Sequence, residues 1–298
     1  MKLVWSPHYH LDIGPHVWPT AKYDRIRECL LAEALVGTDA FVEPEPASWE
    51  DLALVHTADY LRKTRTGTLS RADVERLELP MSPAIADGFR LMTGGTCRAA
   101  ELALEHRIAV HLGGGLHHAF AGHGEGFCLF NDVAVSIRRL QRHGRIARAA
   151  VVDCDVHQGN GTAMIFDGDP SVFTCSIHQQ HNYPLFKPRS DLDIGLADGV
   201  RDETYLHDLE RALPEVLASA PDLVIYLAGA DPFEQDQLGG LALTLEGLRH
   251  RDRLVLRATA GIPVAIVLAG GYARRVEDTV TIHTATVIEA LARARVHA

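Results

Sequence analysis

The segment VVDCDVHQGNGT, residues 151–162, places two carboxylates and an imidazole at the end of an apolar run. Asp153, Asp155 and His157 stand at positions i, i+2 and i+4, so in an extended strand their side chains share one face. Burying an unpaired carboxylate is costly, and the segment must supply a compensating partner. A divalent transition metal binds carboxylate oxygen and imidazole nitrogen together and would neutralise the charge. The pattern therefore predicts a metal site.

A further ligand is predicted from DLVIYLAGAD, residues 222–231. Asp231 follows its apolar run by two residues, at the carboxyl end of a second strand, where α/β sheets place their sites. Asp155, His157 and Asp231 would give three protein ligands with room for water, which is typical of catalytic metal sites. The first motif alone is explained equally well as an ion-paired strand end, and Asp231 favours the metal.

The paired histidines of HLGGGLHHAF, residues 111–120, could move protons. The three glycines end a strand, and in the loop that follows His117 and His118 can both point toward one substrate. Histidine titrates near neutrality, and an acceptor can hold each ring in one tautomer. Asp153, which the predicted metal does not use, is a natural acceptor. Taken without the other motifs, the pair could simply be a polar loop.

A tyrosine follows the last apolar run, in VLAGGYARR, residues 267–275. Tyr272 comes after two glycines, so its hydroxyl could approach a substrate and donate a hydrogen bond to a developing oxyanion. The alternative is a tyrosine that only packs against the strand end. Metal, water, histidine pair and tyrosine together describe hydrolysis of an amide or ester.

Strands that could carry these residues are predicted where short apolar runs are bounded by Gly or Pro, at 107–112, 148–156, 171–177, 222–229 and 263–270. Helical patterns lie at 96–106, 132–143 (with Asn131 as N-cap and Gly144 as stop), 204–219, 244–260 and 274–295. This alternation predicts one α/β domain with an open, mostly parallel sheet and helices on both faces. The irregular segment 178–203 is expected over the carboxyl edge of the sheet.

Composition narrows the class of protein. The chain has 298 residues, of which 47% are hydrophobic and 23% charged, and its formal net charge is −10 at pH 7. This charge disfavours a nucleic-acid partner and mildly favours cationic partners such as basic peptides or polyamines. No apolar run reaches the roughly 20 residues of a membrane helix and no signal peptide is visible, so we expect a cytoplasmic protein without a membrane partner. The oligomeric state stays open.

With these residues identified, the sequence resembles the histone deacetylase superfamily, which has the arginase-deacetylase fold. The blocks GGGLHHAFAGHGEGFCLFNDVAV, VVDCDVHQGNGT, CSIHQ, AGADPFEQDQLGG and VLAGGYA match family blocks in the family's order. The resemblance covers about residues 5–290 and is greatest to bacterial members near the class IV branch. It implies that residues 1–298 form a single deacetylase-like catalytic domain.

The resemblance implies a zinc hydrolase that removes acetyl or longer acyl groups from the lysine side chain of proteins or peptides. A metal-activated water would attack the amide carbonyl. Ferrous iron is an alternative to zinc, and a structural potassium ion is implied near Asp153, Asp155, His157, Ser176 and Ile177. The implied site consists of Asp155, His157 and Asp231 as metal ligands, His118 as general base and acid, and His117 beside it, oriented by Asp153. It also includes Asn160, Tyr272 at the oxyanion, and Phe127 as a tunnel wall, with Gly126 and Gly270 also at the substrate.

Three departures from the family pattern bear on the substrate. Asn160 stands where some members have a second carboxylate, and a neutral amide supports an imidazolium less. The wall opposite Phe127 has two aromatic candidates, Tyr183 and Phe186. No rim aspartate is found to grip a substrate backbone; ELPMSPAIADG, residues 78–88, occupies that region. The alternative function is therefore deacetylation of small acylated amines such as acetylpolyamines. A third interpretation is a catalytically silent acyl-lysine binding protein.

Overall fold

The apolar runs form the strands of one eight-stranded sheet in a computed structural model that describes residues 1–296. The strand order is β2-β1-β3-β8-β7-β4-β5-β6, and every neighbouring pair is parallel. The strands are β1 (Lys2–Val4), β2 (Phe41–Val42), β3 (Ile108–His111), β4 (Ala149–Asp153), β5 (Val172–Gln179), β6 (Leu192–Leu196), β7 (Leu223–Leu227) and β8 (Val264–Val267).

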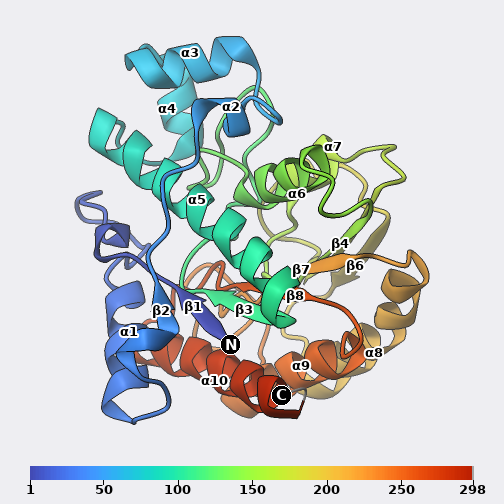
Figure 1. The fold of residues 1–298 in the computed structure, drawn as a ribbon. Coiled ribbons are helices and arrows are strands. Elements are labelled where there is room, and N and C mark those ends of the chain that lie inside the picture. The colour runs from blue at the N-terminus through green and yellow to red at the C-terminus, as the bar shows by residue number, and fades with distance from the viewer. Residues whose placement is uncertain (297–298) are drawn as a thin grey trace.

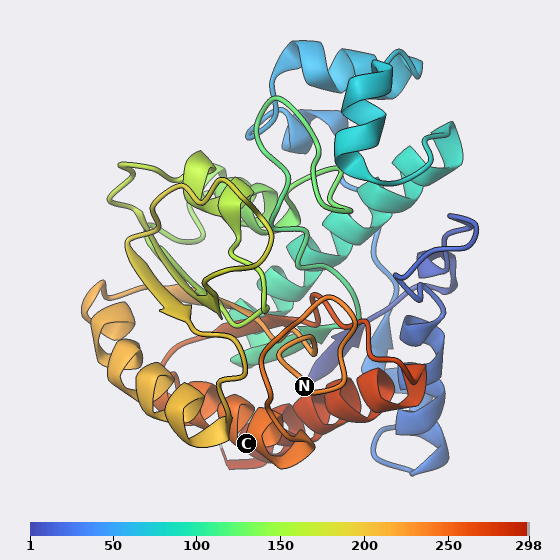
Figure 2. The ribbon, with the colours of Figure 1, turned by 180° about the vertical axis from the view of Figure 1, so that it is seen from behind.

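Helices cover both faces of this sheet, as predicted (Figures 1 and 2). In Figure 1, α5 and α6 lie on one side, and α1, α8, α9 and α10 line the opposite side. The helices are α1 (Lys22–Ala32), α2 (Trp49–Leu52), α3 (Ala58–Thr66), α4 (Arg71–Leu77), α5 (Pro83–His106), α6 (Asp132–Arg142), α7 (Asn160–Ile165), α8 (Asp202–Ala218), α9 (Leu245–Ala258) and α10 (Val276–Val296). Two 3-10 turns, η1 (Pro7–Tyr9) and η2 (Thr38–Ala40), complete the order.

Strand β7 illustrates why the sheet is apolar on both faces. Leu223, Ile225 and Leu227 belong to the core cluster that includes residues of α5 and α6. Val224 and Tyr226 alternate with them and belong to the cluster that includes residues of α8, α9 and α10. A strand covered on both sides needs a continuous apolar run, which is the pattern that the sequence shows.

Four features of the fold differ from the sequence expectations. The strand predicted at 148–156 ends at Asp153, and the helix predicted from residue 96 begins at Pro83, with Ser82 as its N-cap. Gly94 and Gly95 weaken the helical pattern of the sequence in this stretch. The structure explains their presence, because a side chain at either position would collide with the backbone of Glu45 or with Tyr9. The segment 178–203 contains the end of β5 and all of β6. The helices α1 to α4, none of them predicted, build the N-terminal part of the chain.

The sheet order brings the predicted site residues to one edge. Four neighbouring strands, β3, β8, β7 and β4, run parallel, so their carboxyl ends meet. The loop after β3 carries the paired histidines, and the loop after β8 carries Tyr272. The loop after β7 carries Asp231, and the loop after β4 carries Asp155 and His157. Chain segments far apart in sequence are thereby gathered where open α/β sheets bind ligands.

Candidate active site

The three side chains predicted to hold a metal converge beyond the ends of β4 and β7. One potential ligand atom from each of Asp155, His157 and Asp231 lies within 4.8 Å of the others, and all three residues are buried. Nδ1 of His157 is 3.1 Å from Oδ1 of Asp155 and 3.5 Å from Oδ2 of Asp231. The backbone amides of Gly270 and Val156 each donate a 2.9 Å hydrogen bond to one of the two carboxylates. Each carboxylate is therefore anchored by the backbone.

This donor set fits a divalent cation. Oδ2 of Asp231 is buried without a hydrogen-bond partner among residues 1–296, a costly state for a carboxylate. Burial and repulsion from Asp155 raise the pKa of Asp231 to about 7. Burial would lower the pKa of His157, but the two carboxylates outweigh it and raise that pKa to about 10. Zinc takes carboxylate oxygen and imidazole nitrogen, and three protein ligands leave a position for water or substrate.

The chain path at the metal ligands differs from the alternating strand that we predicted. Asp155 and His157 lie beyond the last strand residue, Asp153. Oδ1 of Asp153 accepts a hydrogen bond from the amide of Asp155 at 3.1 Å, and Oδ1 of Asp155 accepts one from the amide of His157 at 3.0 Å. Carboxylates that bond the backbone two residues on favour turns over strand. Two consecutive turns, and not the period of a strand, bring these side chains together.

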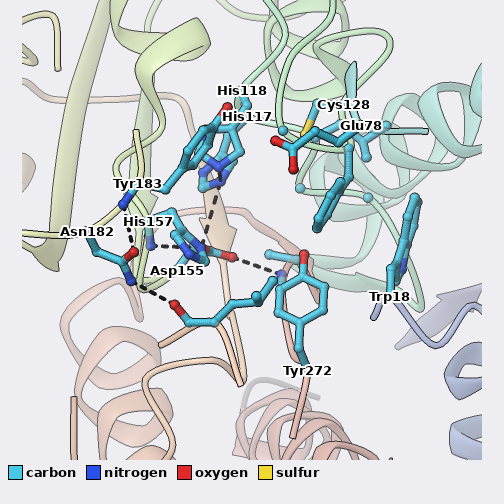
Figure 3. Close-up of a pocket in the computed structure, with 18 of the residues that line it drawn as sticks. Trp18, Glu78, His117, His118, Cys128, Asp155, His157, Asn182, Tyr183 and Tyr272 are labelled. Carbon is cyan, nitrogen blue, oxygen red and sulfur yellow. Dashed lines mark hydrogen bonds and ion pairs between the residues drawn. The ribbon is translucent and has the colours of Figure 1, made fainter. Parts of the chain in front are cut away.

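The paired histidines lie beside Asp155 and His157 (Figure 3), and each imidazole has its own acceptor. Nδ1 of His117 is 2.6 Å from Oδ2 of Asp153, and Nδ1 of His118 is 2.7 Å from Oδ1 of Asn160. The two Nε2 atoms are 3.1 Å apart, so one proton can be shared between them. Burial would lower the pKa of His117, but Asp153 and Asp155 raise it to about 9. Burial and the neighbouring imidazoles hold the pKa of His118 well below its ordinary value.

Tyr272 stands across the pocket from His118 and Tyr183 (Figure 3). Its backbone amide donates to Oδ2 of Asp236 at 2.7 Å, which fixes the loop after β8 to the loop after β7. The preceding Gly271 has φ +149°, a conformation that side chains rarely adopt, and a side chain there would crowd buried neighbours. The tyrosine therefore sits on a constrained turn, with its ring in the pocket wall.

A cavity of about 190 Å³ contains these groups and opens between aromatic side chains. Phe127 lines it and contacts Tyr272 edge to face, with ring centroids 6.0 Å apart. Tyr183 lines the other side, at 4.9 Å from the ring of His118. Phe186, the other candidate for that wall, is 65% exposed and does not line the cavity. Gly126 and Gly270 also line it, and a side chain at Gly270 would overlap the carboxylates of Asp155 and Asp231.

The structure adds pocket residues that the sequence did not single out. Trp18 and Tyr23 line the cavity. Between them in sequence, Lys22 is fully buried, and its Nζ donates to the carbonyl of Ala269 at 3.1 Å. Burial lowers the pKa of Lys22 to about 8, although the Asp231 and Asp155 carboxylates oppose this shift. The sequence signal was the aromatic stretch VWPTAKY, residues 17–23, but nothing in it indicates which way the side chains point.

Two glutamates near the cavity were also missed. Glu78, in a left-handed conformation with φ +60°, lines the cavity and is exposed. Glu125 does not line the cavity but lies behind Asn160 and Tyr183. Its Oε1 accepts hydrogen bonds from Asn160 at 2.7 Å and from Tyr183 at 3.0 Å. The GEGFC motif gave no reason to separate Glu125 from a solvated loop residue. Only the folded chain brings it to Asn160.

A second group of buried charges lies behind the metal ligands. Arg251 in α9 is fully buried, and its Nη2 is 2.9 Å from Oδ1 of Asp252. The same carboxylate accepts from Tyr226 at 2.5 Å and from Thr286 at 2.6 Å. Nη1 of Arg251 donates to the carbonyl of Gly229, two residues before Asp231. This cluster supports the backbone just before Asp231, a candidate metal ligand.

Comparisons with known proteins agree with this geometry. The family model described as "Histone deacetylase domain" matches residues 16–287. An uncharacterized protein of Picosynechococcus is 42% identical over 95% of each chain. Histone deacetylase 2 of Arabidopsis thaliana is 32% identical over 94% of this chain and 78% of its own length. The acetoin utilization protein AcuC of Bacillus subtilis is 31% identical over 84% of this chain and 71% of its own length.

The chain also superposes on solved structures of histone deacetylase homologs. A histone deacetylase homolog from Aquifex aeolicus superposes with a TM-score of 0.83 at 25% identity, over 98% of this chain and 84% of that one. A homolog in complex with SAHA gives a TM-score of 0.84 at 25% identity, with the same coverage. Within residues 1–296, the structure has no helix of the length and apolar character needed to span a bilayer.

Proposed function

This chain belongs to the histone deacetylase family and is a hydrolase acting on amide bonds, and we propose that it removes acetyl or longer acyl groups from lysine side chains of proteins or peptides. The convergence of Asp155, His157 and Asp231 beside the histidine pair and Tyr272 carries this proposal. We propose that residues 1–298 act as one catalytic domain; residues 297 and 298 lie outside the part described.

Each site residue has a proposed role that follows from its surroundings. The family is in general metal-dependent, and zinc, with ferrous iron as the alternative, would bind Asp155, His157 and Asp231. A divalent cation there supplies a Lewis acid for the amide carbonyl and lowers the pKa of a water molecule. Nε2 of His118 takes the proton of the attacking water and returns it to the leaving amine.

The remaining residues orient the base and the substrate. Asp153 holds His117 through a 2.6 Å contact, and Asn160 holds His118 through one of 2.7 Å. The Tyr272 hydroxyl donates to the carbonyl oxygen as it gains charge. Phe127 and Tyr183 face the apolar stem of an acyl-lysine from two sides, and Gly126 and Gly270 leave room beside it. The implied potassium ion, the cytoplasmic location and the position near the class IV branch stay predictions.

The direct test is turnover of acyl-lysine peptides by the purified protein, with and without a chelator. We expect release of the acyl group, loss of turnover with the chelator, and recovery when zinc is returned. Turnover that survives complete metal removal, verified by elemental analysis, would contradict the proposal. A panel of acyl chain lengths on one peptide would define the acyl group that the cavity accepts.

A small acylated amine is the second candidate, and one observation favours it. The carboxylate of Glu78 lines the cavity at an exposed position, where it could pair with the distal cation of an acetylpolyamine. The net charge of −10 also favours a cationic substrate. Comparing kcat/KM for acetyl-lysine peptides with kcat/KM for acetylated spermidine and putrescine separates the two substrate classes.

A further inference from the structure

The side-chain amide of Asn160 is held in one orientation by contacts on both ends. Its Oδ1 faces Nδ1 of His118 at 2.7 Å and also accepts from the amide of Gly161 at 3.0 Å. Its Nδ2 donates to Oε1 of Glu125 at 2.7 Å. If the amide were rotated by half a turn, its NH₂ would face the Gly161 N–H, and its oxygen would face a carboxylate. Both contacts would then be unfavourable.

The orientation of this amide decides where His118 carries its proton. An amide oxygen requires a donor on Nδ1 of His118, so the neutral ring carries its proton there and leaves Nε2 as an unprotonated acceptor. An NH₂ group in that place would instead favour an unprotonated Nδ1, with the proton on Nε2. The second tautomer cannot accept a proton at the nitrogen that points toward His117, 3.1 Å away.

Glu125 is suited to fix the amide because it is itself well anchored. Its Oε1 also accepts from the Tyr183 hydroxyl at 3.0 Å, and its Oε2 is 3.4 Å from Nε2 of His123. Burial would raise its pKa, but the hydrogen bonds from His123, Asn160 and Tyr183 lower it. The side chain is 19% exposed, whereas Asn160 is 1% exposed. A carboxylate near the surface thus reaches a fully buried amide.

We propose that Glu125 is a positioning residue for the reaction: it orients the Asn160 amide so that Nε2 of His118 stays free to act as the base. This inference rests on the proposed function. The same carboxylate oxygen holds Tyr183, whose ring lies edge-on to His118 with centroids 4.9 Å apart. One side chain therefore sets both the tautomer of the base and the wall of the pocket beside it.

The first experiment compares steady-state kinetics of zinc-loaded variants on an acyl-lysine peptide. Glu125→Ala should lower kcat by about ten- to a hundred-fold, the usual effect of removing a group that orients a reacting residue. Glu125→Gln, which keeps an acceptor oxygen for Asn160 and Tyr183, should lose less. His123→Ala removes the half-buried partner of Oε2 but leaves Oε1 with Asn160 and Tyr183, so as the matched control it should keep kcat within about two-fold of the wild type.

A rescue variant distinguishes positioning from a general structural role. In Glu125→Ala/Asn160→Asp, a carboxylate presents an oxygen to His118 in either orientation, so Glu125 is no longer needed. We expect this double variant to recover at least about ten-fold in kcat over Glu125→Ala. A kcat for Glu125→Ala within about two-fold of the wild type, or a double variant no faster than Glu125→Ala, would overturn the proposal.

A spectroscopic measurement reports on the tautomer without turnover. Long-range ¹H–¹⁵N correlation spectra of histidine-labelled, zinc-loaded protein distinguish Nδ1–H from Nε2–H rings. The His118 signal, assigned with a His118→Ala variant, should show Nδ1–H in the wild type and a mixture in Glu125→Ala. An unchanged tautomer in Glu125→Ala would contradict the role of Glu125. An inactive or chelator-insensitive wild type would instead contradict the proposed function, so the two failures are distinct.

Discussion

Two groups of buried charges lie close together, one around Asp231 at the sheet edge and one around Asp252 between β7, α9 and α10, and they differ in how completely they are paired. Around Asp252, both carboxylate oxygens accept hydrogen bonds, from Arg251, Tyr226 and Thr286. Around Asp231, the amide of Val156 satisfies one oxygen, and the other has no hydrogen-bond partner among residues 1–296, with Nδ1 of His157 at 3.5 Å as a more distant charged neighbour. Both carboxylates are essentially inaccessible to solvent.

The difference shows which buried charges point to function. A complete set of partners, as around Asp252, offsets the cost of burying the charges and leaves no position for a ligand. An incomplete set within a group of metal-type donors, as at Asp231 beside Asp155 and His157, points to a ligand from outside the chain, and the donor types indicate what that ligand is. Matched substitutions in the two groups can test this distinction.

Asp231→Asn should have the largest effect on activity. It removes a proposed metal ligand, so turnover should fall by about a thousand-fold or more, together with the metal content. Turnover of an acyl-lysine peptide and elemental analysis measure the two quantities. A variant that keeps one zinc per chain and wild-type turnover would show that Asp231 is not a ligand.

The same substitution should stabilise the metal-free protein. The pKa of Asp231 is raised to about 7 in the folded state, against about 3.9 in an unfolded chain. Between these values the folded chain holds a proton that the unfolded chain releases, so the free energy of unfolding decreases as pH rises from about 4 to 7. The side chain at position 231 does not titrate in the Asp231→Asn variant, so above pH 7 the metal-free variant should be more stable than the metal-free wild type. Urea unfolding of both metal-free proteins at several pH values measures it, and parallel pH curves would refute the argument.

Tyr272→Phe should separate chemistry from metal binding. The hydroxyl touches no metal ligand, so metal content and stability should stay near wild type. Loss of a hydrogen bond to the developing oxyanion should lower kcat by about a hundred- to a thousand-fold. A protein that only binds acyl-lysine would instead show binding of the peptide by calorimetry and no turnover in the wild type.

Asp252→Asn tests the completely paired group. It leaves the buried Arg251 without its counter-ion, which should reduce the free energy of unfolding by about 3–5 kcal/mol. Turnover per metal-loaded, folded molecule should fall far less than in Asp231→Asn, because the ligands remain. Chemical unfolding and kinetics at low temperature provide the two measurements. An activity loss as large as that of Asp231→Asn, with unchanged stability, would reverse our assignment of the two groups.

Glu78→Gln extends the comparison to an exposed carboxylate and should have the smallest effect. Solvent screens an exposed ion pair, so KM for acetylated spermidine should rise by about two- to five-fold, with little change in kcat. KM for a neutral acyl-lysine peptide should stay unchanged and serves as the control. An equal change for both substrates would remove the support that Glu78 gives to a small-amine substrate.

Much of the sheet and the central part of the site could be predicted, because both depend on local pattern. The run around Val224 and Tyr226 is apolar throughout, and the carboxyl end of a parallel strand is a fixed place for a ligand such as Asp231. The helix α5 was predicted too short, because Gly94 and Gly95 interrupt the helical pattern. The residues that require glycine there are distant in the sequence. The family resemblance implied the roles of residues such as Phe127.

Other parts of the site depend on contacts that no local pattern encodes. Trp18 and Lys22 come from an N-terminal segment that reaches the pocket only in the folded chain, where α1 packs against α10 and Trp18 lies beside Phe89 of α5. Asn160 was predicted as a neutral partner of His118, but Glu125 behind it lies 35 residues earlier in the chain. Nothing in the sequence favoured Tyr183 over Phe186 as the second wall. In the folded loop, Tyr183 lines the cavity and Phe186 does not.

The position of β8 has a consequence for how the protein is made. It is the final strand in sequence, yet it lies between β3 and β7 and joins β2-β1-β3 to β7-β4-β5-β6. During translation the two parts of the sheet therefore have no strand pairing between them until residues 264–267 have left the ribosome. A nascent or prematurely terminated chain that lacks β8 carries the histidine pair and the aspartates on two parts of the sheet that no strand pairing joins. The candidate site is complete only after β8 and the following loop with Tyr272 have been made.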